Sequence, residues 1–173
     1  MQFVQTTLGR KGDYSVRAVL DIANHAGQRR KSREIAEEMD IPVRYLPQIL
    51  ANLVEHDILS AEAGPTGGYL LARPATDITL LDVVEASEGP IRIDRCVLRG
   101  GPCDWDMSCP VHIPWTLALD ALTNELAGTT FGELAIHGEQ IADGTYKIPA
   151  NMPPHVIPTP RMPPPSKKGT SST

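Results

Sequence analysis

Residues 32–71 read SREIAEEMDIPVRYLPQILANLVEHDILSAEAGPTGGYLL, and this stretch decides the predicted fold. Ser32 is typical of a helix N-cap, and the apolar pattern after it predicts a short helix through Met39. A tight turn at residues 40–42 leads to a second predicted helix over residues 43–55. That helix carries a one-sided apolar stripe of Leu46, Ile49, Leu50 and Leu53. Two helices joined by a short turn form the helix-turn-helix pattern.

The residues after the second helix predict a β-hairpin. Residues 58–63 and 69–72 fit strands, and GPTGG at residues 64–68 supplies the glycines and proline of a turn between them. A hairpin directly after a helix-turn-helix is a wing. The predicted fold class is therefore mainly α with a small β-hairpin wing, that is, a winged helix-turn-helix. An all-helical bundle is the alternative, and the glycine-rich hairpin argues against it.

Further helices are predicted on both sides of this stretch. They cover residues 13–25, residues 80–86 behind an N-cap at Thr79, and residues 113–126. A last short helix follows a capping pattern that starts at Thr130. The long helix over residues 113–126 has an apolar stripe formed by Trp115, Leu119, Leu122 and Leu126. Packing into the core of one subunit is the simplest explanation of that stripe.

The chain is predicted to have three parts. Residues 8–88 form the winged helix-turn-helix domain, residues 89–140 contain the cysteines and the long helix, and residues 141–173 form a tail. Eight of the 16 prolines lie beyond Gly144. Such a segment buries too little apolar surface to offset its chain entropy. We therefore predict that the tail is disordered.

Charge gives a local indication and not a global one. The formal net charge of the 173-residue chain is −5, which shows no general affinity for nucleic acid. Over residues 1–35, however, seven Lys or Arg residues face three Asp or Glu residues. This basic excess fits a face that contacts phosphates and equally fits a solvated surface.

The predicted location is cytoplasmic, with no membrane partner. No stretch approaches the roughly 18 apolar residues of a membrane span. Residues 1–12 contain no apolar core of a signal peptide. An odd number of cysteines argues against a secreted disulfide framework, and in the cytoplasm thiolates stay available to bind metal.

The three cysteines, Cys96, Cys103 and Cys109, are the only ones in the chain. Three thiolates are one short of a four-thiolate site, which indicates a metal or iron–sulfur site completed by another ligand. Zinc sites favour shorter gaps between paired cysteines than the gaps of six and five residues found here. Zinc, a thiol redox switch and three small buried residues without metal remain the alternatives.

Four segments resemble, in the same order, the Rrf-two family of bacterial winged-helix regulators, whose members are IscR-, NsrR- and RirA-like. They are KGDYSVRA at residues 11–18, residues 41–50, the wing at residues 64–70 and the three-cysteine segment. The similarity covers about residues 8–136. It implies an iron–sulfur cluster, [2Fe-2S] or [4Fe-4S], at the cysteines. It also implies a double-stranded DNA operator as ligand and a homodimer formed through the long helix.

The resemblance offers two candidates for the fourth ligand. Cys109-x-x-His112-x-x-Trp115 resembles IscR-like members, in which the histidine completes a [2Fe-2S] cluster. Asp13 stands where NsrR-like members supply a carboxylate to a [4Fe-4S] cluster from the partner subunit. Asp13 also fits the N-cap of the first helix, and His112 also fits an ordinary polar residue at a helix start. We favour His112, and we note that the first cysteine gap is one residue longer than is usual in the family.

The predicted DNA contacts fall into three sets. On the second helix of the helix-turn-helix, which would read bases, they are Arg44, Tyr45 and Gln48. The candidates for phosphate contact are Arg10, Lys11, Ser32 and Arg33. At the wing tip they are Thr66 and Gly67.

Two positions depart from the family pattern. Pro47 replaces a glutamate of IscR-like members and removes a backbone donor, so the helix can start later than residue 43. Ala63 replaces an arginine that some members insert into the minor groove.

These features predict a dimeric DNA-binding transcriptional regulator, and not an enzyme. Its operator affinity would depend on a cluster at the cysteines that senses iron, nitric oxide or redox state. One alternative is a DNA-binding repressor with a thiol redox switch or a zinc site. A small metal-dependent or electron-transfer enzyme is another alternative, which the lack of other clustered His, Asp or Glu residues disfavours.

Overall fold

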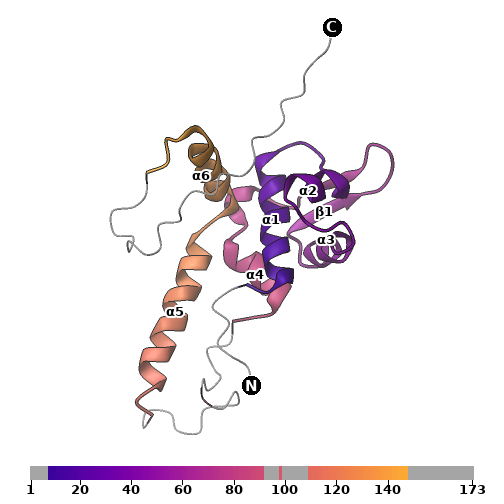
Figure 1. The fold of residues 1–173 in the computed structure, drawn as a ribbon. Helices are drawn as coiled ribbons and strands as arrows, with labels where there is room; N and C mark the ends of the chain where they lie inside the picture. The colour runs from indigo at the N-terminus through magenta and orange to yellow at the C-terminus, as the bar shows by residue number, and fades with distance from the viewer. Residues whose placement is uncertain (1–7, 92–97, 99–108, 148–173) are drawn as a thin grey trace. The chain divides into compact units, whose positions relative to one another are not determined.

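The computed structural model of the chain describes residues 8–91, 98 and 109–147. Within them lie six α-helices, one short 3-10 helix and a two-stranded antiparallel sheet, which confirms the predicted fold class (Figure 1). The elements are α1 (Arg10–Asn24), α2 (Ser32–Glu38), α3 (Leu46–Glu55), β1 (Leu59–Glu62), β2 (Gly68–Leu71), η1 (Ala75–Asp77), α4 (Leu80–Glu88), α5 (His112–Gly128) and α6 (Phe131–Asp143). Of the tail predicted to be disordered over residues 141–173, residues 148–173 lie outside the described residues, whereas residues 141–143 form the end of α6, so the predicted start of the tail is wrong.

Helix α1 is the central element of the winged helix-turn-helix region. It packs against α2, α3, α4 and β2, and α3 in turn packs against α4 and β1. The apolar face predicted for α3 is confirmed, because all four residues of its stripe are buried. Helix α2 places Ile35 and Ala36 in the core.

The wing is held to the body of the domain by the segment between α1 and α2. Strands β1 and β2 pair from Leu59 opposite Leu71 to Glu62 opposite Gly68. Arg30 adds a bridge to Tyr69, with both backbone hydrogen bonds formed at 3.0 and 2.8 Å. The guanidinium of Arg30 also donates two hydrogen bonds of 2.9 Å to the fully buried carboxylate of Asp21 in α1. This pairing raises the pKa of Arg30.

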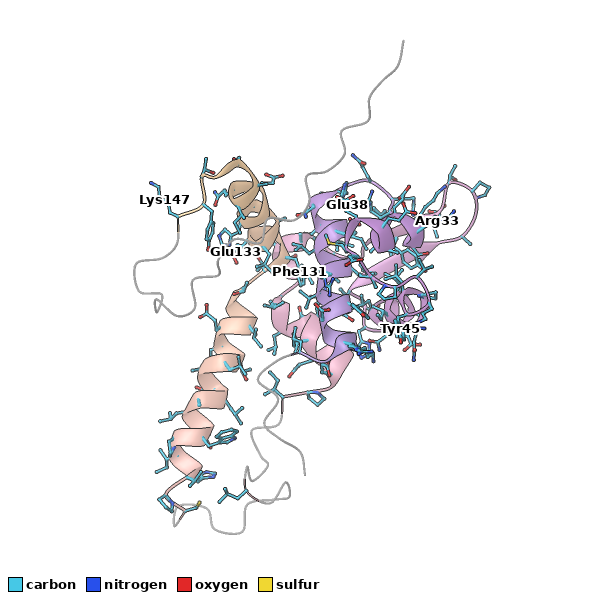
Figure 2. The ribbon with its side chains drawn as sticks, viewed as in Figure 1. Arg33, Glu38, Tyr45, Phe131, Glu133 and Lys147 are labelled. Atoms are coloured by element: carbon cyan, nitrogen blue, oxygen red, sulfur yellow. The ribbon has the colours of Figure 1, made fainter. Side chains whose placement is uncertain are left out.

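The start of α4 is confirmed as a capping box. The Thr79 hydroxyl accepts the Asp82 N–H at 3.1 Å, and the Asp82 carboxylate accepts the Thr79 N–H at 3.0 Å. The chain that follows α5 returns to this point, because Phe131 donates its N–H to the Ile78 carbonyl at 2.9 Å. The Phe131 ring is fully buried in the core (Figure 2).

The predicted start of α1 is wrong by three residues. The helix starts at Arg10 with Gly9 as N-cap, so Asp13 lies inside the first turn and is not the cap. Gly9 has no side chain to cap the helix, and the carboxylate of Glu88 in α4 accepts the Gly12 N–H at 2.8 Å instead. A Cβ atom at residue 12 would lie 2.6 Å from that carboxylate oxygen, so a larger residue there would require the Glu88 side chain to move.

The predicted starts of α2 and α3 also need correction. Lys31, and not Ser32, is the N-cap of α2, and the Glu34 carboxylate accepts the Lys31 N–H at 2.9 Å. Helix α3 begins at Leu46 and not at residue 43, which places Pro47 in its first turn. Proline is tolerated there because its missing N–H would have no helical partner.

Helix α5 differs from the others in burial. Of its 17 residues, all of which are described, none is buried. It packs against α4 along one side. Among the described residues, no helix is both long and apolar enough to cross a membrane.

The chain divides into two compact units, residues 1–135 and residues 136–173. The described part of the second unit contains the later turns of α6 and the residues up to Lys147. Within it, the ring of Tyr146 packs edge-on against His137 with centroids 5.2 Å apart. The N–H groups of Thr145 and Tyr146 both donate to the Gln140 carbonyl, at 2.8 and 2.9 Å, and thereby close the end of the helix.

Candidate DNA-binding surface and cysteine site

The base-reading candidates gather at the N-terminus of α3. Arg44 and Gln48 are exposed, and Tyr45 is half-buried as the N-cap of the helix (Figure 2). The Tyr45 N–H donates to the Pro42 carbonyl at 3.0 Å, which fixes the turn before the helix. The Arg44 guanidinium carbon lies 4.7 Å from the centroid of the Tyr45 ring, in a cation–π contact.

A second tyrosine lies beneath the first. Tyr14 of α1 stacks on Tyr45 with centroids 6.0 Å apart and an interplanar angle of 28°. The Arg17 guanidinium carbon lies 5.4 Å from the Tyr14 centroid. Arg17 also binds both carboxylate oxygens of Asp13 and donates to the Met39 carbonyl at 3.0 Å. The bond to Asp13 raises the pKa of Arg17.

The four phosphate-contact candidates differ in how their side chains are engaged. Arg10 and Lys11 are exposed on the first turn of α1, and neither forms an ion pair with a carboxylate of the described residues. Arg33 is exposed but lies 3.7 Å from Glu37, its neighbour one turn later on α2. Ser32 is half-buried in the first turn of the same helix.

Lys31 is a further candidate for phosphate contact that is not among the four predicted from the sequence. It is exposed at the N-terminus of α2, and its ammonium group pairs with no carboxylate in the part of the chain that the structure describes. Spacing alone does not indicate this, because Lys31 has Glu34 three residues later just as Arg33 has Glu37 four residues later, and the structure shows that Glu34 instead accepts the Lys31 backbone N–H and pairs with Arg30. Lys31 is therefore a better phosphate-contact candidate than Arg33.

The two wing candidates have different roles in the turn. Thr66 is exposed, whereas Gly67 is buried and donates its N–H to the Gly64 carbonyl at 3.0 Å. A Cβ atom at residue 67 would lie 2.1 Å from the Glu62 carbonyl oxygen, so the turn accepts only glycine there. Gly67 thus shapes the wing, and Thr66 presents a side chain at its surface.

The structure describes one of the three cysteines and the histidine near it. Cys109 is 5% exposed, and its carbonyl accepts the His112 N–H at 3.1 Å. His112 is the half-buried first residue of α5. A thiol and an imidazole therefore lie on one turn at the start of this helix. Cys96 and Cys103 lie outside the described residues.

The alternative ligand, Asp13, is engaged elsewhere. Both oxygens of its carboxylate accept hydrogen bonds from Arg17 on the next turn of α1. The described residues contain no group of three or more His, Cys, Asp or Glu side chains placed to hold a metal ion. Cys109 and His112 thus lie on one turn, and Asp13 lies on a separate helix, where Arg17 binds its carboxylate.

The surface of α5 is apolar beyond the contact with α4. Ile113, Leu117 and Leu122 are exposed by 49, 63 and 49%. Trp115, Leu119 and Leu126, the rest of the predicted stripe, are only half-buried. The stripe therefore does not pack into a core within the chain, contrary to the simplest expectation from the sequence.

Comparison with known proteins finds similarity to regulators of transcription. A family model described as Rrf2, iron-dependent transcriptional regulator, matches residues 8–137. The HTH-type transcriptional regulator IscR of Escherichia coli O1:K1 is 34% identical over 137 residues, which cover 79% of this chain and 83% of that protein. The names describe regulators of transcription, and not enzymes.

Solved structures agree in fold. CymR, the global cysteine regulator of B. subtilis, matches with a TM-score of 0.64 at 24% identity, over 79% of this chain and 98% of its own. IscR of T. potens matches with a TM-score of 0.62 at 23% identity, over 84% and 95% of the two chains. With the family model matching most of its length, the chain belongs to the Rrf2 family of transcriptional regulators.

Proposed function

We propose that the protein is a cytoplasmic, homodimeric regulator that binds a double-stranded DNA operator. We further propose that an iron–sulfur cluster held by Cys96, Cys103, Cys109 and His112 controls its operator affinity. In this proposal residues 8–88 bind DNA, and residues 89–140 carry the sensor and the dimer contacts. The observation that carries the proposal is the surface at the N-terminus of α3, where Arg44, which has no ion-pair partner among the described residues, and Gln48 are exposed on a winged helix-turn-helix.

The position of these side chains suits base readout. In helix-turn-helix proteins, residues near the N-terminus of the second helix contact base edges in the major groove. Arg44 lies in the turn just before α3 and Gln48 in the first turn of the helix, and both side chains are exposed at this end of α3, so both could enter the same groove. Arginine can bind O6 and N7 of guanine with two hydrogen bonds, and glutamine can bind N6 and N7 of adenine with two hydrogen bonds. Arg10, Lys11 and Lys31 would contact phosphates.

Helix α5 supports a dimer. A helix with three large exposed apolar side chains and no buried residue leaves a hydrophobic surface that a second copy would cover. Closed two-fold dimers are the commonest assembly of soluble proteins. A dimer would present two copies of α3 to two half-sites of a palindromic operator.

The donors at the start of α5 fit an iron–sulfur cluster. Cysteine thiolates hold such clusters, and histidine replaces cysteine on one iron in some of them. When bound, the cluster would supply a centre that responds to iron supply and oxidation. The thiol of Cys109 is shielded from solvent, and the imidazole of His112 lies on the same turn, so little further ordering is needed to present both.

The contacts of Asp13 favour His112 as the fourth ligand. To reach a cluster, the Asp13 carboxylate would have to leave Arg17, which also holds the Met39 carbonyl at the end of α2. The Arg17 and Asp13 side chains are 36% and 42% exposed, so breaking this i, i+4 ion pair has a small cost of about 0.3–0.5 kcal/mol. His112 has no comparable side-chain partner among the described residues.

The test is a comparison of His112→Ala and Asp13→Ala, purified without oxygen beside the unaltered protein. Iron, zinc and acid-labile sulfide are measured, and resonance Raman and electron paramagnetic resonance spectra are recorded. We expect iron and sulfide in the unaltered protein, a changed spectrum for His112→Ala and an unchanged one for Asp13→Ala. His137→Ala and Asp120→Ala, both at exposed positions, serve as matched controls.

Two outcomes would contradict this proposal in different ways. A spectrum that changes with Asp13→Ala but not with His112→Ala would assign the fourth ligand to the carboxylate. Colourless protein with one tightly bound zinc per chain, or with no metal and oxidisable thiols, would replace the cluster by the zinc site or the thiol switch.

A further inference from the structure

Tyr14 of α1, whose ring stacks on that of Tyr45 at the start of α3, has no part in the function proposed so far. Four side chains form a continuous row, which we call the arginine–tyrosine stack: Arg17, Tyr14, Tyr45 and Arg44. We infer that Tyr14 is a positioning residue that determines DNA sequence specificity by orienting Arg44 through the ring of Tyr45. This inference rests on the proposed DNA-binding role of Arg44.

One end of the arginine–tyrosine stack is fixed. Arg17 donates to both oxygens of Asp13 and to the carbonyl of Met39, so its guanidinium is held between α1 and the end of α2. Tyr14, whose ring this guanidinium contacts, packs against the hydrophobic core. The ring of Tyr14 therefore has a defined position before any DNA binds.

Tyr45 connects the Tyr14 ring to the exposed side chain of Arg44. Its ring lies nearly parallel to that of Tyr14, at an interplanar angle of 28°, and it also packs against the core. Its backbone is fixed by the bond from its N–H to Pro42 and by the bond that its carbonyl accepts from Ile49 at 3.3 Å. The outer face of the Tyr45 ring is thus a fixed surface at the start of α3.

Arg44 is the free end. The structure gives its guanidinium no ion pair with a described carboxylate, and its contact is the ring of Tyr45 at 4.7 Å. A guanidinium that stacks on a ring through its face keeps the N–H groups at its edge available for an acceptor. Holding this long side chain before DNA arrives lowers the entropy lost on binding.

Gln48 provides an internal comparison. It is exposed in the first turn of α3, and it is not one of the four side chains of the arginine–tyrosine stack. Any base preference that Gln48 provides should therefore be independent of Tyr14, while the preference that Arg44 provides should depend on it. A general loss of stability would affect both positions alike.

The experiment uses the full chain and a pool of randomised duplexes about 30 base pairs long, enough for two half-sites one helical turn apart. The bound fraction is sequenced for the unaltered protein, Arg44→Ala, Gln48→Ala and Tyr14→Leu. Affinity for the best duplex is then measured by fluorescence anisotropy for these proteins and for the double variant Tyr14→Leu/Arg44→Ala. Thermal unfolding shows that each variant is folded.

We expect Tyr14→Leu to weaken preference only at the base that Arg44→Ala also relaxes, with affinity lowered about 3- to 10-fold. The double variant should bind no more weakly than Arg44→Ala alone, because Tyr14 acts through Arg44. Tyr14→Phe keeps the ring and should behave like the unaltered protein. Tyr146→Leu, a matched change in the C-terminal unit, should have no effect on binding.

The results separate this inference from the proposed function. If Arg44→Ala relaxes one base position but Tyr14→Leu leaves it intact, or if the two changes are additive, the inference is wrong and the proposed function stands. If neither Arg44→Ala nor Gln48→Ala alters base preference, the recognition surface itself is wrong and both fall. If Tyr14→Leu fails to fold, Tyr14→Met, which retains more volume, is judged by the same two criteria.

Discussion

The winged helix-turn-helix region and helix α5 treat apolar side chains in opposite ways. Helices α1, α3 and α4 each bury one face inside the chain, and Leu46, Leu50 and Leu53 of α3 are fully covered. Helix α5 is longer than any of these and buries no residue. The first region buries these faces in a core that Phe131 completes from the start of α6, whereas α5 leaves large apolar side chains exposed. The candidate base-reading residues thus stand on a domain with a closed core, whereas Cys109 and His112 lie at the start of a helix whose apolar surface is exposed.

The largest effect is expected from placing a charge on the exposed apolar surface of α5. Leu117→Glu would place a carboxylate in the proposed two-fold interface, where an unpaired buried charge costs about 3–5 kcal/mol. Sedimentation velocity should show that the protein becomes monomeric while thermal unfolding of the monomer is little changed. Asn124→Glu, which adds the same charge at an exposed polar position of α5, is the control. A dimer of unaltered affinity in Leu117→Glu would remove α5 from the interface.

The complementary change is a truncation inside the core of the winged helix-turn-helix region. Leu50→Ala removes a fully buried side chain of α3 and should lower the free energy of unfolding by about 2–5 kcal/mol in denaturant titrations. Leu122→Ala makes the same chemical change on α5, where the side chain is 49% exposed. When both are measured in a Leu117→Glu background, the second should have a much smaller effect. Equal losses would mean that α5 belongs to the same core.

A smaller effect, on base discrimination, is expected from the candidate base-reading residues at the start of α3. Arg44→Ala and Gln48→Ala should each cost about 1–3 kcal/mol of discrimination at one base position, because each removes a candidate base contact. Both side chains are exposed, so the free energy of unfolding should stay nearly constant. Competition titrations with single-base operator variants measure the effect. Unchanged discrimination in both variants would show that α3 does not read the bases.

The smallest effect is expected from single phosphate contacts. Lys11→Ala and Lys31→Ala should weaken binding to all duplexes and reduce the slope of log affinity against log salt by about 1 each. Arg33→Ala should change the slope less, because Arg33 is already paired with Glu37. Anisotropy titrations over a range of salt concentrations give the slopes. A larger change for Arg33→Ala than for Lys31→Ala would reverse our assignment.

The sequence predicted those parts of the fold that depend on local pattern. The stripe of α3, the wing and the Thr79–Asp82 capping box are set by residues close in the chain, and all three are confirmed. The start of α1 was missed because its cap comes from Glu88, 76 residues away from Gly12. No local pattern contains such a contact.

The candidate site was predictable in composition but not in arrangement. Residue types and spacing indicated Arg44, Gln48 and the Cys109–His112 turn. The arginine–tyrosine stack could not be predicted, because it joins α1 to α3 through tertiary packing. The hydrogen bonds from Arg17 to Asp13, by contrast, could have been predicted, because the two residues have the i, i+4 spacing of a helical ion pair.

The central claim is that a cluster at the start of α5 controls operator affinity. The direct measurement is an anaerobic titration of one protein sample with its selected operator, before and after removal of iron and sulfide, beside Cys109→Ala. We expect the two affinities of the unaltered protein to differ by about 5- to 150-fold, the usual range of coupling between two sites. Cys109→Ala should bind with the iron-free affinity throughout. Equal affinities of iron-loaded and iron-free protein would contradict the claim.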